Sequence, residues 1–528
     1  MKRHIPLPQN PHTYLLITLL ACTGLLTTFK IKTFTLWGSL LNGHLWLREP
    51  SLSMVDRITI TKAGLPVTNP QWLSEVLFGA AQTLGGLTGV IMLKSALVMA
   101  MIGLLWQHMR EREASPLIIF WIALVTVFLS HFRLTVGPQV ITYLLLMYLG
   151  TRLHAYKNGR ITRLWHVLPL MALWSNLHFG SIFGFILLLT YLAAAILART
   201  WPYLFDGNLK YPVDGPMLRH LALITALAAA ACCLTPAGFG FWTYPLESMY
   251  LAIKYRVPEY FPPRVFGYTM LPVFWCALAF YVTVIFGMIR RVDVFDMLVF
   301  VIGAALALKV VNLIPIFAVF SAPVIIHYLS LLVRDREWPA GISRILGQRG
   351  ITAGLALALV CVFLVAKGGP QSTYQFGFGA NRNLLPLDAV RFMKTNRVGG
   401  NILNDMDWGG FLAYQLYPDN KVFIQNRLDT MGDAFYEIYF ELIAGRPGWD
   451  ATLRSYHIDV VVLSRWLAQR APLTVALTAS PYWHLVYIDD QTYIYVREKP
   501  EFRELIGKFA YKTAIEREPK MKGVIRDK

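Results

Sequence analysis

The sequence is poor in the features that mark disulfide-bonded proteins and several common classes of enzyme. Only five cysteines occur in 528 residues, and all of them lie in apolar runs. The polar C-terminal region therefore contains neither a disulfide framework nor a zinc motif. The chain also has no phosphate-binding glycine loop, no serine or cysteine nucleophile motif and no paired-histidine metal site. These absences exclude motif-based assignments to nucleotide-binding enzymes, hydrolases and zinc enzymes.

Acidic residues are scarce as well, with 31 Asp and Glu against 49 Lys and Arg, which gives a net charge of +18. Hydrophobic residues make up 55% of the chain, and apolar stretches of about 20 residues, the length that crosses a bilayer, recur along it. In such a protein the basic excess is typical of cytoplasmic loops, so we expect no nucleic-acid partner.

The apolar runs predict a polytopic α-helical membrane protein with about 11 transmembrane helices. The loops between alternate runs, such as "HMREREA" and "RLHAYKNGRITRLWH", are rich in basic residues and share a side with the N-terminus. The positive-inside rule makes this side cytoplasmic and places the C-terminal region outside the membrane. The predicted spans lie near residues 14–29, 87–107, 116–132, 138–153, 165–177, 180–198, 217–235, 270–289, 294–312, 314–333 and 351–367.

Two long loops, 30–86 and 236–270, fall on the outer side and carry cations against the charge rule. Either these loops translocate regardless of charge and meet anionic headgroups, or they line a cationic cavity that holds a phosphate. Polar residues at the outer ends of the predicted spans favour a functional site there, because ionisable groups at membrane depth are costly. The loop cations are Lys30, Lys32, Arg48, Arg57, Lys62, Lys254, Arg256 and Arg264, and the polar residues at span ends are Arg133, Asn176, His178, Lys309 and Asn312.

The remainder of the chain is organised differently from the membrane region, residues 1–367. Between residues 368 and 500, the short apolar runs "GNILNDM", "KVFIQN" and "IDVVVLS" predict strands, and they alternate with amphipathic stretches such as "DAFYEIYFELIAG". This alternation predicts an extracytoplasmic α/β domain. "HLVYIDDQTYIYVRE" has the pattern of a β-hairpin, and residues 501–528 form a charged tail.

Several segments together resemble a known superfamily over residues 30–497. They are "TLWGSLLNGHLWL", "SMVDRITITKAGLPVTNPQWLSEVL", "RLTVGPQVITYLLL", "WSNLHFGSIFGF", "TPAGFGFWTYPLE", "VPEYFPP" and "DWGGFLAYQLYPDNKVFIQNRLDTMG". The chain resembles bacterial members of the GT-C glycosyltransferases, which include protein mannosyltransferases, aminoarabinose transferases and oligosaccharyltransferase catalytic subunits. The resemblance implies a protein of the bacterial cytoplasmic (inner) membrane with a catalytic first outer loop and a lipid-phosphate cavity.

The resemblance also implies a reaction, the transfer of a sugar from a polyprenyl-phosphate-linked donor to an acceptor. A carboxylate must orient or deprotonate the acceptor, and cations, or a divalent cation as cofactor, must stabilise the departing phosphate. The expected catalytic carboxylates are Asp56 and Glu75. The expected phosphate and lipid partners are Arg133, His178, Lys309 and Arg427. The expected acceptor-side residues are Glu259, Asp407 and Trp408, although "DWGG" is also typical of a tight turn before a helix.

Four departures from the family pattern leave a second interpretation open. The acid that opens the first loop in the family is Thr35 here, and threonine cannot act as a general base. The other departures are Gly137-Pro138 for an arginine-proline, Lys309 or Asn312 for an arginine, and Gln425-Asn426-Arg427 for "DGR". Either Asp56 has taken over the catalytic role, or the chain is a degenerate scaffold or lipid-binding subunit with a protein partner in the cell envelope. A transporter is disfavoured, since the two halves contain no inverted repeat.

Overall fold

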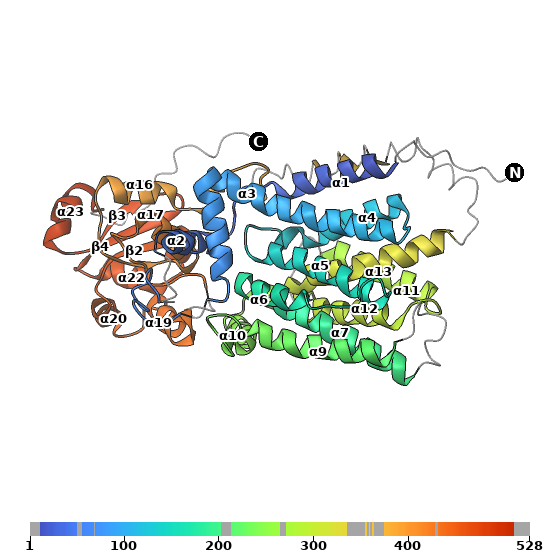
Figure 1. The fold of residues 1–528 in the computed structure, drawn as a ribbon. Coiled ribbons are helices and arrows are strands. Elements are labelled where there is room, and N and C mark those ends of the chain that lie inside the picture. Colours follow the sequence, from blue (N-terminus) through green and yellow to red (C-terminus); the bar gives the residue numbers. More distant parts are fainter. Residues whose placement is uncertain are drawn as a thin grey trace. The chain divides into compact units, whose positions relative to one another are not determined.

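The computed structural model describes residues 11–49, 55–67, 69–201, 213–264, 271–334, 374–427 and 431–511, together with three residue pairs between 354 and 363. These residues fall into two compact units (Figure 1). The helical unit comprises residues 1–32, 70–74 and 81–380. The sheet unit comprises residues 33–69, 75–80 and 381–528, so the first long loop joins the C-terminal region in a single unit.

Long apolar helices packed side by side make up the helical unit (Figure 1). Each of them occupies one of the apolar runs that hydropathy had singled out. The helices are α1 (Pro11–Thr27), α3 (Trp72–Glu111), α4 (Pro116–Ser130), α5 (Gln139–Lys157), α6 (Val167–Leu177), α7 (Ser181–Thr200), α9 (Gly215–Cys232), α11 (Leu271–Gly287), α12 (Val294–Lys309) and α13 (Ile314–Arg334).

Among the described residues, five helical segments are long and apolar enough to cross a membrane, and three further apolar helices are shorter. The chain is therefore a multi-pass membrane protein. The total of about 11 spans stays a prediction, because most of the segment 351–367 lies outside the described residues.

Helix α3 is interrupted at a glycine pair. Gly86 has φ 60° and ψ −155°, a conformation that only a residue without a Cβ adopts readily. The span predicted to begin at residue 87 starts at this break, and the short helical segment before it carries Glu75.

The sheet unit contains a four-stranded mixed sheet of order β1-β2-β4-β3. Strands β1 (Asn401–Asn404) and β2 (Ile458–Ser464) are parallel, whereas β4 (Thr492–Arg497) is antiparallel to both β2 and β3 (Trp483–Ile488). The predicted hairpin is thus β3–β4. The surrounding helices are α2 (Thr35–Arg48), α16 (Leu387–Thr395), α17 (Gly409–Leu416), α19 (Asp433–Ile443), α20 (Trp449–Ser455), α21 (Arg465–Ala468), α22 (Pro472–Ala479) and α23 (Arg503–Phe509).

The segment "KVFIQN" forms only isolated bridges, which corrects its prediction as a strand of the sheet. Val422 bridges both Ile402 at the end of the sheet and Thr59 of the first loop. The Ile60 N–H donates to the Val422 carbonyl at 2.9 Å, and the Thr61 hydroxyl donates to the Phe423 carbonyl at 2.9 Å. This segment therefore connects the first loop to the C-terminal sheet.

Candidate functional site

Three cations from separate elements gather at one end of the helical unit. Lys32 follows α1, Lys94 lies within α3, and Arg133 ends the short 3₁₀ turn η1 (His131–Arg133) after α4. We call these three residues the cation cluster. No carboxylate forms an ion pair with any of them within the described part of the chain.

Aromatic rings supply the nearest partners of the two ammonium groups. The Lys32 Nζ lies 3.4 Å from the centroid of the Tyr374 ring, and the Lys94 Nζ lies 3.7 Å from that of Phe29. The imidazole of His131 packs against both rings, with centroid distances of 4.6 Å to Tyr374 and 5.5 Å to Phe29. Cation–π contacts stabilise a desolvated ammonium, but they do not neutralise its charge.

The cluster is short of both hydrogen-bond acceptors and negative charge. Lys94 is fully buried, and neither its Nζ nor the buried Nε of Arg133 has a hydrogen-bond partner. Burial lowers the pKa of Lys32 to about 8, an effect that the charge of Arg133 reinforces and that of Glu259 opposes. Buried cations without counter-ions are unfavourable, so this arrangement suits an anion supplied from outside the chain.

One carboxylate lies close enough to act electrostatically on the cluster. Glu259 belongs to the 3₁₀ turn η2 (Pro258–Tyr260), which packs against η3 (Val311–Leu313) through a hydrogen bond from the Val311 N–H to the Phe261 carbonyl at 3.0 Å. Its side chain is half-buried and forms no hydrogen bond or ion pair with any described residue. Glu259 is therefore a carboxylate that acts electrostatically on Lys32 and has no hydrogen-bond or ion-pair partner among the described residues.

The two carboxylates expected to be catalytic belong to the sheet unit and are engaged within it. Asp56 accepts from the N–H groups of Ile58 at 2.8 Å and Thr59 at 2.7 Å, and from the Thr59 hydroxyl at 3.0 Å. Glu75 is 2% exposed and pairs with Arg427 at 2.6 Å and with the Asn69 amide at 2.7 Å. Both side chains hold the fold of the first loop in place.

The remaining sheet-unit candidates also have internal partners. Arg427, expected to bind phosphate, is buried against Glu75 and lies in the other unit from Lys32 and Arg133. Asp407 accepts from the Asn426 amide, and the Trp408 indole donates to the Leu384 carbonyl at 3.0 Å. "DWGG" forms the turn η5 (Met406–Trp408) ahead of α17, as expected of a tight turn before a helix.

His178 and Lys309 share the helical unit with the cluster but differ in their surroundings. His178 is buried near Arg133, and its Nδ1 is engaged by the Thr142 hydroxyl at 2.7 Å and the Gly180 N–H at 3.2 Å. Lys309 is exposed at the C-terminal end of α12, and no contact with the cluster is seen. In the described residues no three Asp, Glu, His or Cys side chains converge on a point where a metal ion could sit.

The opposite end of the helical unit holds a second group of buried charges. Lys157 pairs with Asp293 at 2.7 Å and with Asp296 at 3.8 Å, and Arg112 lies 3.6 Å from Asp296. The Tyr328 hydroxyl donates to Asp296 at 3.0 Å. We call Arg112, Lys157, Asp293 and Asp296 the balanced network, because its two cations face two carboxylates.

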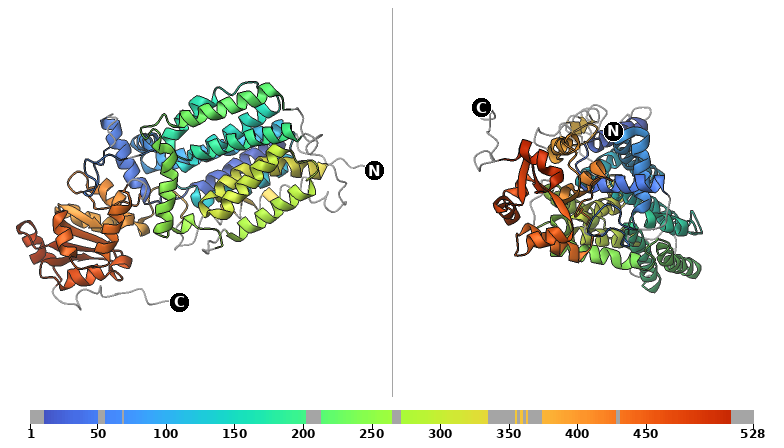
Figure 2. Two further views of the ribbon diagram at one scale, coloured as in Figure 1. Left: turned by 90° about the horizontal axis from the view of Figure 1, so that it is seen from below. Right: turned by 90° about the vertical axis from the view of Figure 1, so that its left-hand side faces the viewer.

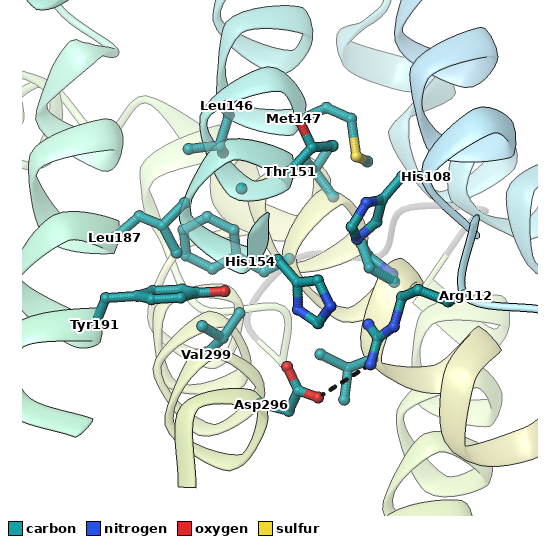
Figure 3. A pocket seen from close by; sticks show the side chains of 15 residues that line it. His108, Arg112, Leu146, Met147, Thr151, His154, Leu187, Tyr191, Asp296 and Val299 are labelled. Carbon is teal, nitrogen blue, oxygen red and sulfur yellow. Dashed lines mark ion pairs between the residues drawn. The ribbon is translucent and has the colours of Figure 1, made fainter. Parts of the chain in front are cut away.

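Arg112 and His154 point toward Asp296 across a small pocket beside this network (Figure 3). The pocket encloses about 40 Å³. That volume accommodates water but lies far below the several hundred Å³ of a small-molecule site. The network thus serves to join the ends of α3, α5 and α12.

Sequence reasoning found Arg133 and the loop lysine Lys32 but missed Lys94. The signal was present, because Lys94 is a charged residue inside the predicted span 87–107, where ionisable groups are rare. The pairing of Lys157 with Asp293 was also missed, since the two residues lie 136 positions apart in sequence.

No protein-family model and no curated protein matches the sequence. Solved structures do match. The chain is similar to the apo oligosaccharyltransferase of Archaeoglobus fulgidus, with 12% identity and a TM-score of 0.58 over 93% of this chain and 75% of that chain. The AglB oligosaccharyltransferase of the same organism, in complex with an inhibitory peptide and a dolichol-phosphate, gives 10% identity and a TM-score of 0.57 over 92% and 74%.

A third similar structure is the arabinofuranosyltransferase AftD from Mycobacteria, with 14% identity and a TM-score of 0.50. The alignment covers 93% of this chain and 42% of that chain. Together these likenesses establish that the chain has a GT-C-like fold.

Proposed function

We propose that the protein is a membrane glycosyltransferase that takes a sugar from a polyprenyl-phosphate-linked donor. The observation that carries the proposal is the cation cluster, in which the buried Lys94 and the half-buried Lys32 and Arg133 form no ion pair with any carboxylate among the described residues. A lipid-linked phosphate supplies negative charge at membrane depth, and its prenyl chain stays among apolar helices. The dolichol-phosphate in the similar AglB structure is consistent with a ligand of this class.

The geometry suggests roles for two kinds of group. As the bond between the anomeric carbon and the phosphate oxygen breaks, its electron pair passes to the phosphate, and the cations of the cluster stabilise the growing charge. The acceptor oxygen or nitrogen forms the new bond to the anomeric carbon, and its proton passes to the Glu259 carboxylate. We assign Glu259 this role in place of Asp56 and Glu75, because both of those side chains are engaged in the sheet unit.

A second candidate function is a lipid-phosphate-binding subunit of a cell-envelope assembly that does not catalyse transfer. It is favoured by Thr35 at the family's acidic position and by the structural engagement of Asp56 and Glu75. In both cases we propose the bacterial cytoplasmic membrane as the location, with the N-terminus inside and the sheet unit outside.

Native mass spectrometry of the purified protein, followed by a turnover assay, tests these proposals. We expect a polyprenyl phosphate or its glycosylated form to copurify with the wild type and to be lost from Arg133→Ala. Arg290→Ala is the matched control, because Arg290 is exposed and distant in sequence from the cluster residues. Absence of any polyprenyl lipid from the wild type would overturn both candidate functions.

The variant Glu259→Gln separates the two candidates, because it removes the base but leaves the cations intact. If the protein is a transferase, this variant retains the lipid and loses turnover by at least about a hundredfold, the usual contribution of a general base. If turnover persists in Glu259→Gln and is lost in Asp56→Asn, the catalytic base is Asp56 in the first loop and not Glu259. Lipid binding without turnover in the wild type would favour the binding subunit.

A further inference from the structure

Helix α10 (Gly240–Lys254) differs in direction from the other long helices of its unit. It begins shortly after α9 ends and precedes α11, so it lies between two apolar helices at the same end of the helical unit as Arg133. Figure 2, left, shows this green helix crossing the ends of its neighbours, whereas they run alongside one another. A helix so placed lies roughly parallel to the membrane plane.

The side chains of α10 divide into three strips when successive residues are separated by about 100° around the axis. One strip is buried against the helical unit and contains Phe241, Tyr244, Leu251 and Ala252. The second strip is exposed and apolar and contains Phe239 just before the helix, Leu246, Met249, Tyr250 and Ile253. The third strip is polar and exposed and contains Thr243, Glu247 and Lys254.

The exposed apolar strip is too large and too continuous for a surface that faces water. Leu246 is 63% exposed and Tyr250 is 61% exposed, and the two residues are four positions apart on one side of the helix. Contiguous exposed apolar side chains of this kind mark a surface that contacts another apolar phase.

The neighbouring helices identify that phase. Exposed apolar side chains also occur on α9 at Leu223 and Leu227, just after α9 at Leu234, and on α11 at Trp275 and Phe280. Those helices are apolar segments of a multi-pass membrane protein, so their exposed side chains face acyl chains. An in-plane helix with one protein-facing, one apolar and one polar strip has the form of an interfacial helix.

We propose that α10 lies in the membrane interface at the Arg133 end of the helical unit. Its apolar strip, Phe239, Leu246, Met249, Tyr250 and Ile253, is immersed among the acyl chains, and its polar strip faces the headgroups. The partner of this surface is the lipid bilayer and not a second protein.

The position of α10 fixes the depth of the groups that follow it in sequence. Residues Tyr255–Val257 lead directly from α10 to Glu259, whose carboxylate acts on Lys32. If the proposed function holds, a lipid-linked phosphate reaches the cation cluster at headgroup level, with its prenyl chain still in the bilayer. This consequence rests on the proposed function, whereas the interfacial position of α10 does not.

Spin labels on single cysteines test the proposal in the full-length protein, in a background without the native cysteines and reconstituted in lipid nanodiscs. Labels at Leu246, Tyr250 and Ile253 examine the apolar strip, and labels at Thr243 and Glu247 are matched controls on the same helix. All five side chains are exposed, so the replacements remove little packing. The measured quantity is relaxation by oxygen, which concentrates in lipid, against relaxation by a water-soluble nickel chelate.

We expect oxygen to dominate at the three apolar positions and the nickel chelate to dominate at the two polar positions. Dominance of the nickel chelate at all five positions would overturn the proposal, because the apolar strip would then face water. Weak relaxation by both reagents at the apolar positions would also overturn it, because a protein surface would then cover the strip. Neither result depends on sugar transfer or on a bound lipid phosphate, so this test fails separately from the proposed function.

Discussion

The charged residues at the two ends of the helical unit differ in whether they have partners of opposite charge. In the balanced network, Arg112 and Lys157 face Asp293 and Asp296 within ion-pair distance. In the cation cluster, three cations share a site with aromatic rings, and the only described carboxylate that acts on Lys32 is Glu259. Helix α3 contributes to both arrangements, because Lys94 lies within it and Arg112 directly follows its last residue. The stretch of α3 from Lys94 to its C-terminal end is roughly 25 Å long.

This difference separates charges that stabilise the fold from charges that, under the proposed function, bind a ligand. A buried ion pair whose partners are both present is self-sufficient, and removing one partner leaves an uncompensated charge. In the cation cluster, no described carboxylate forms an ion pair with the three cations. Under the proposed function, a bound anion offsets the cost of this arrangement, as is typical of functional sites.

The largest effect is expected where the balanced network loses a partner. Lys157→Ala leaves Asp293 and Asp296 side by side without their shared cation, and we expect it to lower the free energy of unfolding by about 3–5 kcal/mol. The control Arg160→Ala breaks an exposed pair with Glu111 and should cost at most about 1 kcal/mol. Unfolding in detergent micelles measures both free energies. An equal loss in the two variants would show that the buried pairs of the balanced network stabilise the fold no more than an exposed pair does.

A slightly smaller loss is expected in the sheet unit. Glu75→Gln removes the buried carboxylate that pairs with Arg427 at 2.6 Å and should lower the free energy of unfolding by about 3 kcal/mol. The control Glu49→Gln, which disrupts an exposed pair with Arg57, should have little effect. Loss of turnover in a fully stable Glu75→Gln variant would instead assign Glu75 a catalytic role.

The cation cluster should respond in the opposite direction. Lys94→Met removes a fully buried charge without a hydrogen-bond partner, so we expect the free energy of unfolding to rise by about 1 kcal/mol or more. The same variant should bind polyprenyl phosphate about tenfold more weakly, because a charge-assisted contact is lost. Unfolding and lipid titration in the same detergent test both parts, and a destabilised Lys94→Met would show that this lysine supports the fold.

The smallest effect is a dependence of lipid-phosphate binding on pH. The pKa of Lys32 is lowered to about 8, so its ammonium is charged below that pH and loses its proton above it. Affinity for a phosphodiester should therefore be constant below pH 8 and fall by at most about tenfold per pH unit above it. Lys32→Arg stays charged in this range and should abolish the decline. A wild-type affinity unchanged up to pH 10 would exclude Lys32 from phosphate binding.

Much of the fold follows from local sequence patterns. The apolar runs predicted the long helices of the helical unit, because burial in lipid depends on the composition of about 20 neighbouring residues, whereas α2 and α10 lie in segments predicted as outer loops. "IDVVVLS" and the hairpin around Asp489 and Asp490 were predicted from alternation and turn residues in the same way. "KVFIQN" was predicted wrongly as a strand, since its pattern shows apolar character but not which backbone groups it will meet.

The candidate site was only partly open to such reasoning. Arg133 was a candidate because a charge at the end of an apolar run is conspicuous, and Glu259 was a candidate because it is a carboxylate in the second outer loop. The same reasoning chose Glu75 and Arg427 for chemistry, whereas they pair with each other across 352 positions. The charge of a side chain can be read from the sequence, but whether that side chain can bind a ligand depends on which partner the fold brings close to it.

The sequence by itself therefore determined the helical membrane architecture, the sheet-forming segments and the set of charged residues from which a site could be built. Only the tertiary structure decided that Glu75 and Asp56 are engaged, that Lys94 joins Lys32 and Arg133, and that Glu259 acts electrostatically on Lys32. The physical reason is the sequence distance over which each property is set. The hydropathy of a span depends on about 20 consecutive residues. An ion pair forms between atoms a few Å apart, and the two residues can lie hundreds of positions apart in the chain.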